Sequence, residues 1–387
     1  MSKYAEKAWG LGFIGVIAAM AGVGCGNGAA TVSAPGFDVM ERSIVELGAA
    51  LDAGEVTSRQ LVTGYLARIA AYDTRGPGLN AMVLLGDDVL MVADARDAER
   101  AQGQVRGPLH GVPVVVKDNY DTADMPTSAG TIGLATSIPP DDAFQVRRLR
   151  EAGAIILGKT NMHELARGIT TVSSIAGQTR NPYDPSRNPG GSSGGTGAAV
   201  AASYAAVGMG SDTCGSIRIP SAHHALVGLR GTRGLASGDG IIPLSTTQDI
   251  GGPLARSVED LAITLDATVG PDPADQTTQR GVGRIPATFT DALDAGGLRG
   301  ARVALLDELL GDTGAERPVR SVIEAAAEEM TAAGAELVEI GETDFGALLD
   351  GASLIGLEFK FDFDRYLAST PGAPVGSLAE LVERGLY

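Results

Sequence analysis

Three short segments of the chain carry one lysine and two serines that could act together in nucleophilic catalysis. The segment G-V-P-V-V-V-K-D-N supplies Lys117, G-G-S-S-G-G supplies Ser192, and D-T-C-G-S-I-R supplies Ser216. A serine hydroxyl becomes a good nucleophile only when a base removes its proton. A buried lysine can lose its own proton and serve as that base, whereas arginine stays charged. These residue types therefore indicate serine chemistry with lysine, rather than histidine, as the base.

Lysine is scarce in this chain, which makes each lysine informative. Only five of the 30 basic side chains are lysines, and two of those five, Lys3 and Lys7, lie in the first seven residues. The chain therefore uses arginine wherever it needs only a positive charge. Lys117 and Lys159, which both follow apolar runs, are the lysines whose position calls for an explanation.

The composition indicates a globular protein with a large core. The chain has 387 residues, of which 44% are hydrophobic, enough for one large α/β domain or two ordinary ones. Glycine is abundant without a fixed period, which favours many tight turns over a repeat architecture. The formal net charge of −17 would repel phosphate backbones, so nucleic acid is not an expected partner.

The N-terminal residues are typical of a bacterial export signal. Two lysines precede an apolar stretch over residues 9–24, and Cys25 follows a small-residue stretch that matches a lipoprotein cleavage site except at Gly22, where leucine is usual. We expect a signal over residues 1–25, a tether over 26–37, and an exported protein that is either anchored to a membrane by a lipid on Cys25 or periplasmic or secreted. The alternative is a buried N-terminal helix. Cys214 then has no disulfide partner.

Apolar runs and helical periodicities alternate along the rest of the chain, which predicts an α/β fold. Helices are expected at 58–72, 87–102, 143–151, 195–206, 257–269, 319–333, 345–367 and after Ser377, with a further helix opened by the capping box Ser43–Glu46. Short buried strands are expected at 112–116, 154–157, 206–209, 303–306 and 336–340. We predict a single domain over residues 38–387 with a central, mixed sheet covered by helices on both faces.

A phosphate-loop pattern, G-x-x-x-x-G-K-T, covers residues 153–160. Such a loop must follow a strand, so that its N–H groups are free to bind phosphate. Here the four residues between the glycines are themselves the apolar strand. The pattern therefore predicts a structural role for Lys159 and no nucleotide site.

A nucleophile-elbow pattern, G-x-S-x-G, surrounds Ser192. An elbow requires a strand before the serine, yet three prolines fall within residues 181–189, which excludes a central strand. It also requires a later histidine, and the only candidates are His223 and His224, which are better explained as packing or helix-surface residues. A Ser-His-Asp hydrolase is therefore disfavoured.

No metal or cofactor site is expected. His163 and Glu164 begin the zinc pattern H-E-x-x-H, but Arg167 occupies the place of the second histidine.

The glycine-serine run at 190–195 leads directly into a small-residue helix, and exposed N–H groups at such a start could hold an oxyanion or a proton-passing hydroxyl. A flexible linker is the alternative.

The residues just described carry a family resemblance. The run G-G-S-S-G-G-T-G-A-A-V-A-A and the later G-S-D-T-C-G-S-I-R-I-P resemble the amidase signature, and G-V-P-V-V-V-K-D-N and A-G-A-I-I-L-G-K-T-N-M-H-E-L-A resemble the segments that precede it in that family. The core of the resemblance covers residues 105–235, and a looser likeness extends from about residue 41 to the end of the chain.

The resemblance implies a serine amidase with a Ser–cis-Ser–Lys triad and no cofactor. Ser216 would be the nucleophile, and Ser192, held by a cis peptide bond, would pass its proton to the neutral base Lys117. Backbone N–H groups of the turn before and at the nucleophile would hold the oxyanion, namely those of Thr213, Cys214, Gly215 and Ser216. Side chains around the triad would support it, namely Ser193, Asp212 and Arg218.

Two departures from the family pattern affect these expectations. Most members have glycine where this chain has Cys214, which bears on rate and substrate range. Members also commonly continue beyond the length seen here, so the resemblance implies either a compact variant or a fragment that lacks part of the sheet.

Three functions remain open at this stage. The first is an exported hydrolase of small or peptide amides, favoured by a segment over residues 357–367 that is reminiscent of the peptide-amidase branch. The second is the glutaminase subunit of a tRNA-dependent amidotransferase, which shares the signature but works in the cytoplasm. The third is a truncated, non-catalytic relative, against which the presence of all three triad residues argues.

Overall fold

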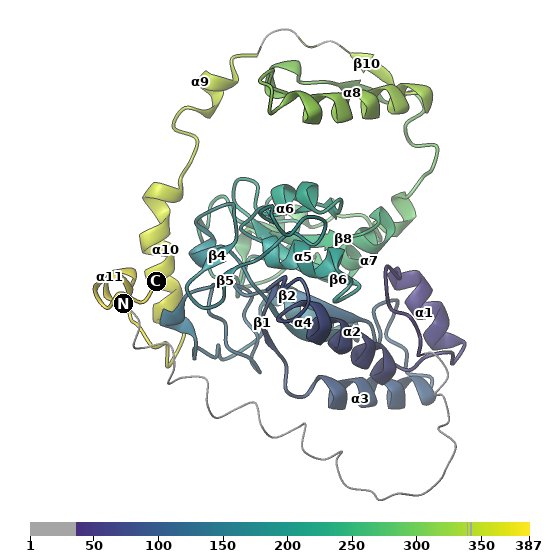
Figure 1. Cartoon of the computed structure of the whole chain (residues 1–387), viewed down its shortest axis with the longest axis vertical. Helices are drawn as coiled ribbons and strands as arrows, with labels where there is room; N and C mark the ends of the chain where they lie inside the picture. The colour runs from purple at the N-terminus through teal and green to yellow at the C-terminus, as the bar shows by residue number, and fades with distance from the viewer. Residues whose placement is uncertain (1–35, 339, 341–342) are drawn as a thin grey trace, which may run out of the picture. The chain divides into compact units, whose positions relative to one another are not determined.

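Six strands form a mixed sheet in the order β1-β3-β2-β6-β8-β7, drawn with its helices in Figure 1. The strands are β1 Met82–Leu85, β2 Pro113–Lys117, β3 Ile155–Thr160, β6 Val207–Asp212, β7 Val227–Gly228 and β8 Ile250–Ala255. The inner strands β3, β2 and β6 run parallel, whereas β1, β8 and β7 pair antiparallel with their neighbours. The expected α/β fold with a central, mixed sheet is therefore confirmed. This computed structural model describes residues 36–338, 340 and 343–387; the predicted signal and almost all of the tether lie outside that part.

The inner strands are buried along their whole length, which explains why they could be recognised in the sequence. Every residue of β2, β3 and β6 is buried, as is typical of strands covered on both faces. The expected strands at 112–116, 154–157 and 206–209 are confirmed, but β3 continues to Thr160 and β6 continues to Asp212. These extensions carry the polar residues that matter for the site.

Helices flank this sheet (Figure 1). They are α1 Ile44–Asp52, α2 Ser58–Tyr72, α3 Val89–Ala101, α4 Phe144–Glu151, α5 Gly194–Ala201, α6 Arg218–His223 and α7 Val258–Thr268. Ser43 and Glu46 form the predicted capping box of α1. Helix α5 packs on β2 and β6, and α7 packs on β8. The predicted helix over 195–206 is too long, because the chain leaves α5 after Ala201 and Ser203 takes a positive φ of 53°.

The later part of the chain holds the remaining elements. They are β9 Arg302–Ala304, α8 Arg317–Ala332, β10 Glu336–Val338, α9 Phe345–Leu349, α10 Ile355–Ser369 and α11 Leu378–Glu383, and β9 pairs with β10 in parallel. Short elements are β4 Val172–Ser173, β5 Gly177–Gln178 and the 3-10 turns Ile132–Leu134, Glu164–Ala166, Gln276–Gly281, Thr290–Ala292 and Asp307–Leu309. No helix in the described part of the chain is long and apolar enough to cross a membrane.

The prediction of one long helix over residues 345–367 is wrong. The structure has two helices, α9 and α10, separated by residues 350–354. Gly351 adopts a φ of +66° in this break, a left-handed conformation that ends a helix and that glycine adopts without strain. Helix α10 then packs Phe359, Phe363 and Leu367 into a second apolar cluster with Ile242 and Leu244.

Candidate active site

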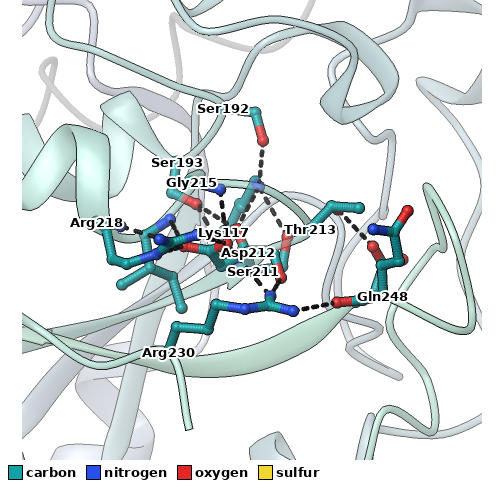
Figure 2. A network of polar contacts seen from close by, with 12 residues as sticks. Lys117, Ser192, Ser193, Ser211, Asp212, Thr213, Gly215, Arg218, Arg230 and Gln248 are labelled. Carbon is teal, nitrogen blue, oxygen red and sulfur yellow. Dashed lines mark hydrogen bonds and ion pairs between the residues drawn. The ribbon is translucent and has the colours of Figure 1, made fainter. Parts of the chain in front are cut away.

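Lys117 ends strand β2 and points its amine at two serine hydroxyls (Figure 2). Its Nζ lies 2.7 Å from Ser192 Oγ and 2.8 Å from Ser211 Oγ, with the Ser211 carbonyl oxygen at 3.5 Å. The lysine side chain is fully buried, as is Ser192. The structure therefore brings together two of the three expected catalytic residues in direct contact.

Burial lowers the pKa of Lys117 to about 7, although the charges of Asp249 and Asp212 oppose that shift. Near neutral pH, a large share of these amines is therefore uncharged. An uncharged amine has two N–H groups and one lone pair. The two acceptors on Ser211 can take the N–H groups, which leaves the lone pair free to accept the proton of Ser192.

The glycine-serine run places Ser192 and Ser193 at the start of helix α5. The peptide bond between Gly191 and Ser192 is cis, as the family resemblance implied. The N–H group of Ser193 donates to the Ser216 carbonyl at 3.2 Å, and its hydroxyl donates to the Ser211 carbonyl at 3.2 Å. Ser193 thus ties the segment with Ser192 to the strand and loop that carry Ser211 and Ser216.

Asp212 organises the loop that carries Ser216. Its carboxylate accepts hydrogen bonds from the backbone N–H groups of Gly215 at 2.7 Å and Ile217 at 3.1 Å, and from Nε of Arg218 at 3.1 Å. Burial would raise the pKa of Asp212, but these hydrogen bonds and the Arg218 charge hold it below its ordinary value. Gly215 has a φ of +145°, and a side chain there would collide with Ile219.

The expected oxyanion donors are not equivalent in the structure. The Gly215 N–H group is committed to Asp212, whereas the N–H groups of Thr213, Cys214 and Ser216 donate no hydrogen bond within the described residues. These three groups are available to a ligand. Cys214 is an exposed, free thiol, so its side chain points away from the packed interior of the loop.

Ser216 keeps only 5% of its surface exposed. Its carbonyl accepts the Ser193 N–H group, but its hydroxyl makes no hydrogen bond to Ser192 or to any other described residue. The structure therefore places Ser216 beside the Lys117–Ser192 pair through backbone contacts and leaves its hydroxyl unengaged.

Three polar residues of the site were not predicted from the sequence. Ser211 is the second partner of Lys117, and Asn119 Nδ2 donates to the Ser211 hydroxyl at 3.0 Å. Asp249 accepts the hydroxyl of Thr213. The available signal for Ser211 was a hydroxyl at the end of an apolar strand, directly before Asp212; Asp249 follows no such pattern.

Lys159 has the structural role that the sequence predicted. It lies within β3, is fully buried, and donates to the Tyr120 carbonyl at 2.6 Å and to Thr127 Oγ1 at 2.7 Å. Its charge lies 3.7 Å from the buried carboxylate of Asp118. These contacts use the amine fully and exclude the phosphate-loop interpretation.

The rings of His163 and His224 also lie outside the contacts that join Lys117, Ser192 and Ser216. His224 is buried and its Nδ1 lies 2.7 Å from the Pro220 carbonyl oxygen, which makes it a packing residue. No cluster of three or more potential metal-ligating side chains occurs in the described ranges, and the ring of His163 contacts Thr170.

A cavity of about 530 Å³ lies near the site, although none of Lys117, Ser192 and Ser216 lines it. Asp249, which holds Thr213, is part of its wall, together with Ile250 and Gly251 of β8. Helix α10 also contributes Asp362, Arg365, Tyr366 and Ser369 to the lining of this cavity.

A model of the amidase family matches residues 60–379. The chain belongs to the amidase family. The expectation drawn from the signature motifs is therefore confirmed.

Solved and curated relatives agree with this assignment. The structure of a peptide amidase bound to the inhibitor chymostatin superposes with a TM-score of 0.86 at 45% identity, covering 90% of this chain and 72% of the other. The native peptide amidase of Stenotrophomonas maltophilia gives a TM-score of 0.84 at 44% identity, covering 89% and 71%. A glutamyl-tRNA(Gln) amidotransferase subunit from Acidothermus cellulolyticus is 42% identical, covering 82% of this chain and 62% of that protein.

The chain is shorter than these relatives. It spans 59% of the length of the corresponding amidotransferase subunit from Rhodopirellula baltica, to which it is 41% identical over 78% of its own length.

Proposed function

We propose that this amidase hydrolyses carboxamide C–N bonds through an acyl-enzyme on Ser216. The observation that carries the proposal is the buried Lys117 amine, 2.7 Å from Ser192 and with a pKa of about 7. A base of this pKa is well matched to proton transfer at neutral pH. The proton relay runs from Ser216 through Ser192 to Lys117.

The reaction would begin with attack of Ser216 on the amide carbonyl. The Ser216 oxygen bonds to the carbonyl carbon, its proton passes to Ser192, and the Ser192 proton passes to Lys117. The tetrahedral intermediate collapses with cleavage of the C–N bond, and the proton returns through Ser192 to the leaving amine. Water then attacks the acyl-enzyme, with the same relay as base, and releases the carboxylic acid and Ser216.

The relay needs a hydrogen bond between the hydroxyls of Ser216 and Ser192 in the substrate complex. Catalytic hydrogen bonds commonly tighten only when substrate is bound, and the unengaged Ser216 hydroxyl is free to turn toward Ser192. The free N–H groups of Thr213, Cys214 and Ser216 would hold the developing oxyanion, a contribution worth about 3 kcal/mol for a single donor elsewhere. Asp212, Arg218 and Ser193 would keep the loop in place.

We propose peptide amides as the substrate class. Residues 357–367, reminiscent of peptide amidases in sequence, lie within helix α10. Three residues of that stretch, Asp362, Arg365 and Tyr366, line the cavity that Asp249 also lines. The similarity to solved peptide amidases supports the same class.

A glutaminase subunit is the second candidate, because curated relatives at 41–42% identity are subunits of glutamyl-tRNA(Gln) amidotransferases. Such a subunit would release ammonia from glutamine for a partner protein to use. Ammonia release from glutamine alone, with no release from peptide amides, would favour this candidate over the first.

Ammonia release from a panel of peptide C-terminal amides, simple carboxamides and glutamine tests the proposal. We expect release by the wild-type protein and losses of at least about 1,000-fold in Ser216→Ala and Lys117→Ala. Lys360→Ala is the matched control, because Lys360 is an exposed lysine that pairs with Asp364 on the same helix. Unchanged release by Ser216→Ala would contradict the proposal.

We also propose that the protein is exported and carries a lipid on Cys25, because a basic, apolar and small-residue sequence precedes that cysteine. Incorporation of labelled palmitate in cells, lost in Cys25→Ser and kept in Cys214→Ser, is the expected result. Equal labelling of both variants would contradict it.

A further inference from the structure

Asp249 makes contacts that the mechanism above does not use. It lies just before β8, and one carboxylate oxygen accepts the Thr213 hydroxyl. The other oxygen accepts the backbone N–H groups of Leu244 at 2.7 Å and Ser245 at 3.0 Å. Thr213 lies three residues before Ser216, in the turn that carries the free N–H groups. A single carboxylate therefore joins this turn to a separate segment of backbone.

The turn over residues 213–216 is held at both ends by a carboxylate. Asp212 fixes the later end through Gly215 and Ile217, and Asp249 fixes the earlier end through the side chain of Thr213. Cys214 lies between these two anchors, and its side chain is exposed. Without Asp249, the side chain of Thr213 would lose this anchor.

The backbone segment whose N–H groups donate to Asp249 is itself fixed by helix α10. Glu358 accepts the Ser245 hydroxyl at 2.5 Å and the Thr247 N–H group at 3.1 Å. Asp362 accepts the Thr246 N–H group at 2.8 Å. The Leu244 and Ser245 donors are therefore held on a rigid turn, which makes Asp249 a firm anchor for Thr213.

We propose that Asp249 is a positioning residue for amide hydrolysis, holding Thr213 so that the turn before Ser216 keeps its N–H groups aimed at the reacting carbonyl. The inference rests on the proposed function. Donors that are already oriented need no reorganisation when charge develops, which is how such groups accelerate reactions. The negative charge of Asp249 has a second consequence, because it acts on the base.

Burial raises the pKa of the Asp249 carboxyl, opposed by the hydrogen bonds from Thr213, Ser245 and Leu244, and its charged form acts on Lys117 together with two other titratable groups. Asp212 lies at the end of β6, and His163 lies beside Ser192, whose carbonyl accepts the His163 N–H group. Both carboxylates favour the protonated amine, whereas burial lowers the pKa of His163 and keeps that ring neutral. Removal of the Asp249 charge therefore lowers the pKa of Lys117 further, and the acid limb of the pH profile moves to lower pH.

Four variants test this assignment by steady-state ammonia release across pH. Thr213→Val removes the hydroxyl, Thr213→Ser keeps it, and Asp249→Asn removes the charge. Asp266→Asn is the matched control, because Asp266 likewise accepts one threonine hydroxyl, from Thr290, and the N–H groups of Phe289 and Thr290. Thermal unfolding of each variant is measured in parallel.

We expect Thr213→Val to lower kcat by about 10- to 100-fold and to leave KM within about twofold. A backbone N–H group that no longer points at the oxyanion weakens binding of the transition state but not binding of the substrate. Thr213→Ser should recover most of the rate. Asp249→Asn should lower kcat and move the acid limb to lower pH, while Asp266→Asn changes neither. If Asp249→Asn does not fold, the comparison of Thr213→Val with Thr213→Ser still tests the proposal.

The proposal is overturned if Thr213→Val retains the wild-type kcat, or if Asp249→Asn and Asp266→Asn have the same kinetic profile. It is also overturned if losses of kcat only track losses of thermal stability. A wild-type protein that releases no ammonia would overturn the proposed function and this assignment together. An active wild type with unaffected Thr213 and Asp249 variants would overturn this assignment alone.

Discussion

Lys117 and Lys159 lie on neighbouring parallel strands but on opposite faces of the sheet. Lys159 of β3 pairs with Val116 of β2, the residue directly before Lys117, and successive side chains of a strand point to opposite faces. On one face, Lys117 meets hydroxyls and distant charges; on the other, Lys159 meets Asp118 at 3.7 Å. Two fully buried lysines therefore have different tasks, one poised to lose a proton and one neutralising a carboxylate.

This contrast predicts opposite effects on stability when each lysine is replaced by methionine. Lys159→Met leaves Asp118 buried without its cation and should lower the free energy of unfolding by roughly 3–5 kcal/mol. Lys117→Met removes an amine that forms no ion pair within the described residues and whose pKa burial lowers from 10.5 to about 7, a cost to folding at pH 7, so it should raise the free energy of unfolding at that pH by roughly 1–3 kcal/mol. Urea denaturation at pH 7 measures both. Equal destabilisation by the two substitutions would contradict the assigned roles.

Lys117 should also make stability depend on pH. Its pKa is about 7 in the folded protein and 10.5 by ordinary values, so between these limits the unfolded chain binds more protons. Stability should therefore rise with pH over this range, by up to about 1.4 kcal/mol per pH unit from this group. Lys117→Met should remove that component of the slope. The comparison of wild type and variant at pH 7, 8 and 9 gives the answer, and parallel slopes would speak against a lowered pKa.

The activity should follow the deprotonation of the same amine. We expect kcat/KM to rise with pH through an apparent pKa of about 7, because only the uncharged form accepts the Ser192 proton. Lys117→Arg should abolish activity at every pH, since arginine stays protonated. A pH profile of ammonia release measures this rise of kcat/KM on the acid side. An acid limb near pH 4 with none near 7 would point to a carboxylate base.

Ser211→Ala should reduce kcat/KM by roughly 10- to 100-fold, a loss typical of partners that orient a catalytic group. The substitution removes the acceptor that holds the Lys117 amine and that also receives Asn119. Ser173→Ala is a suitable control, because Ser173 is a buried serine that donates to Asn161 and has no hydrogen bond to Lys117, Ser192 or Ser216 in the described part of the chain. Similar rates for the two variants would remove Ser211 from the site.

Cys214→Ala should leave kcat within about threefold of wild type. The thiol is exposed, and its N–H group, which is the part assigned to the oxyanion, is unchanged by the substitution. Loss of activity by a larger factor, measured as ammonia release, would show that the thiol itself contributes. The replacement of the family's usual glycine by Cys214 would then affect the rate of the reaction.

The sequence predicted the inner strands because each of them contains a short apolar run, as in β2 and β3. It did not predict β8, whose sequence I-G-G-P-L-A contains residues that normally weaken strands. The structure gives the reason: a side chain at Gly251 would collide with Gln145 and Tyr120, and one at Gly252 with the Leu229 carbonyl. Close packing from distant segments overrides local preference there.

The residues of the site could likewise be predicted from the sequence only in part. Lys117 and Ser192 could be identified because each lies in a distinctive motif. Ser211 and Asp249 could not, because their importance depends on contacts with residues 94 and 36 positions away in the chain. The commitment of the Gly215 N–H group to Asp212 was equally invisible in the motif, since only the folded loop shows which donors remain free.

The most direct test of the central claim is to locate the nucleophile. Wild-type protein treated with a fluorophosphonate probe, digested and analysed by mass spectrometry should carry the label on Ser216, with faster labelling as pH rises through 7. Ser216→Ala should remain unlabelled. A label on Ser192 or Ser193, or equal labelling of Ser216→Ala, would contradict the account.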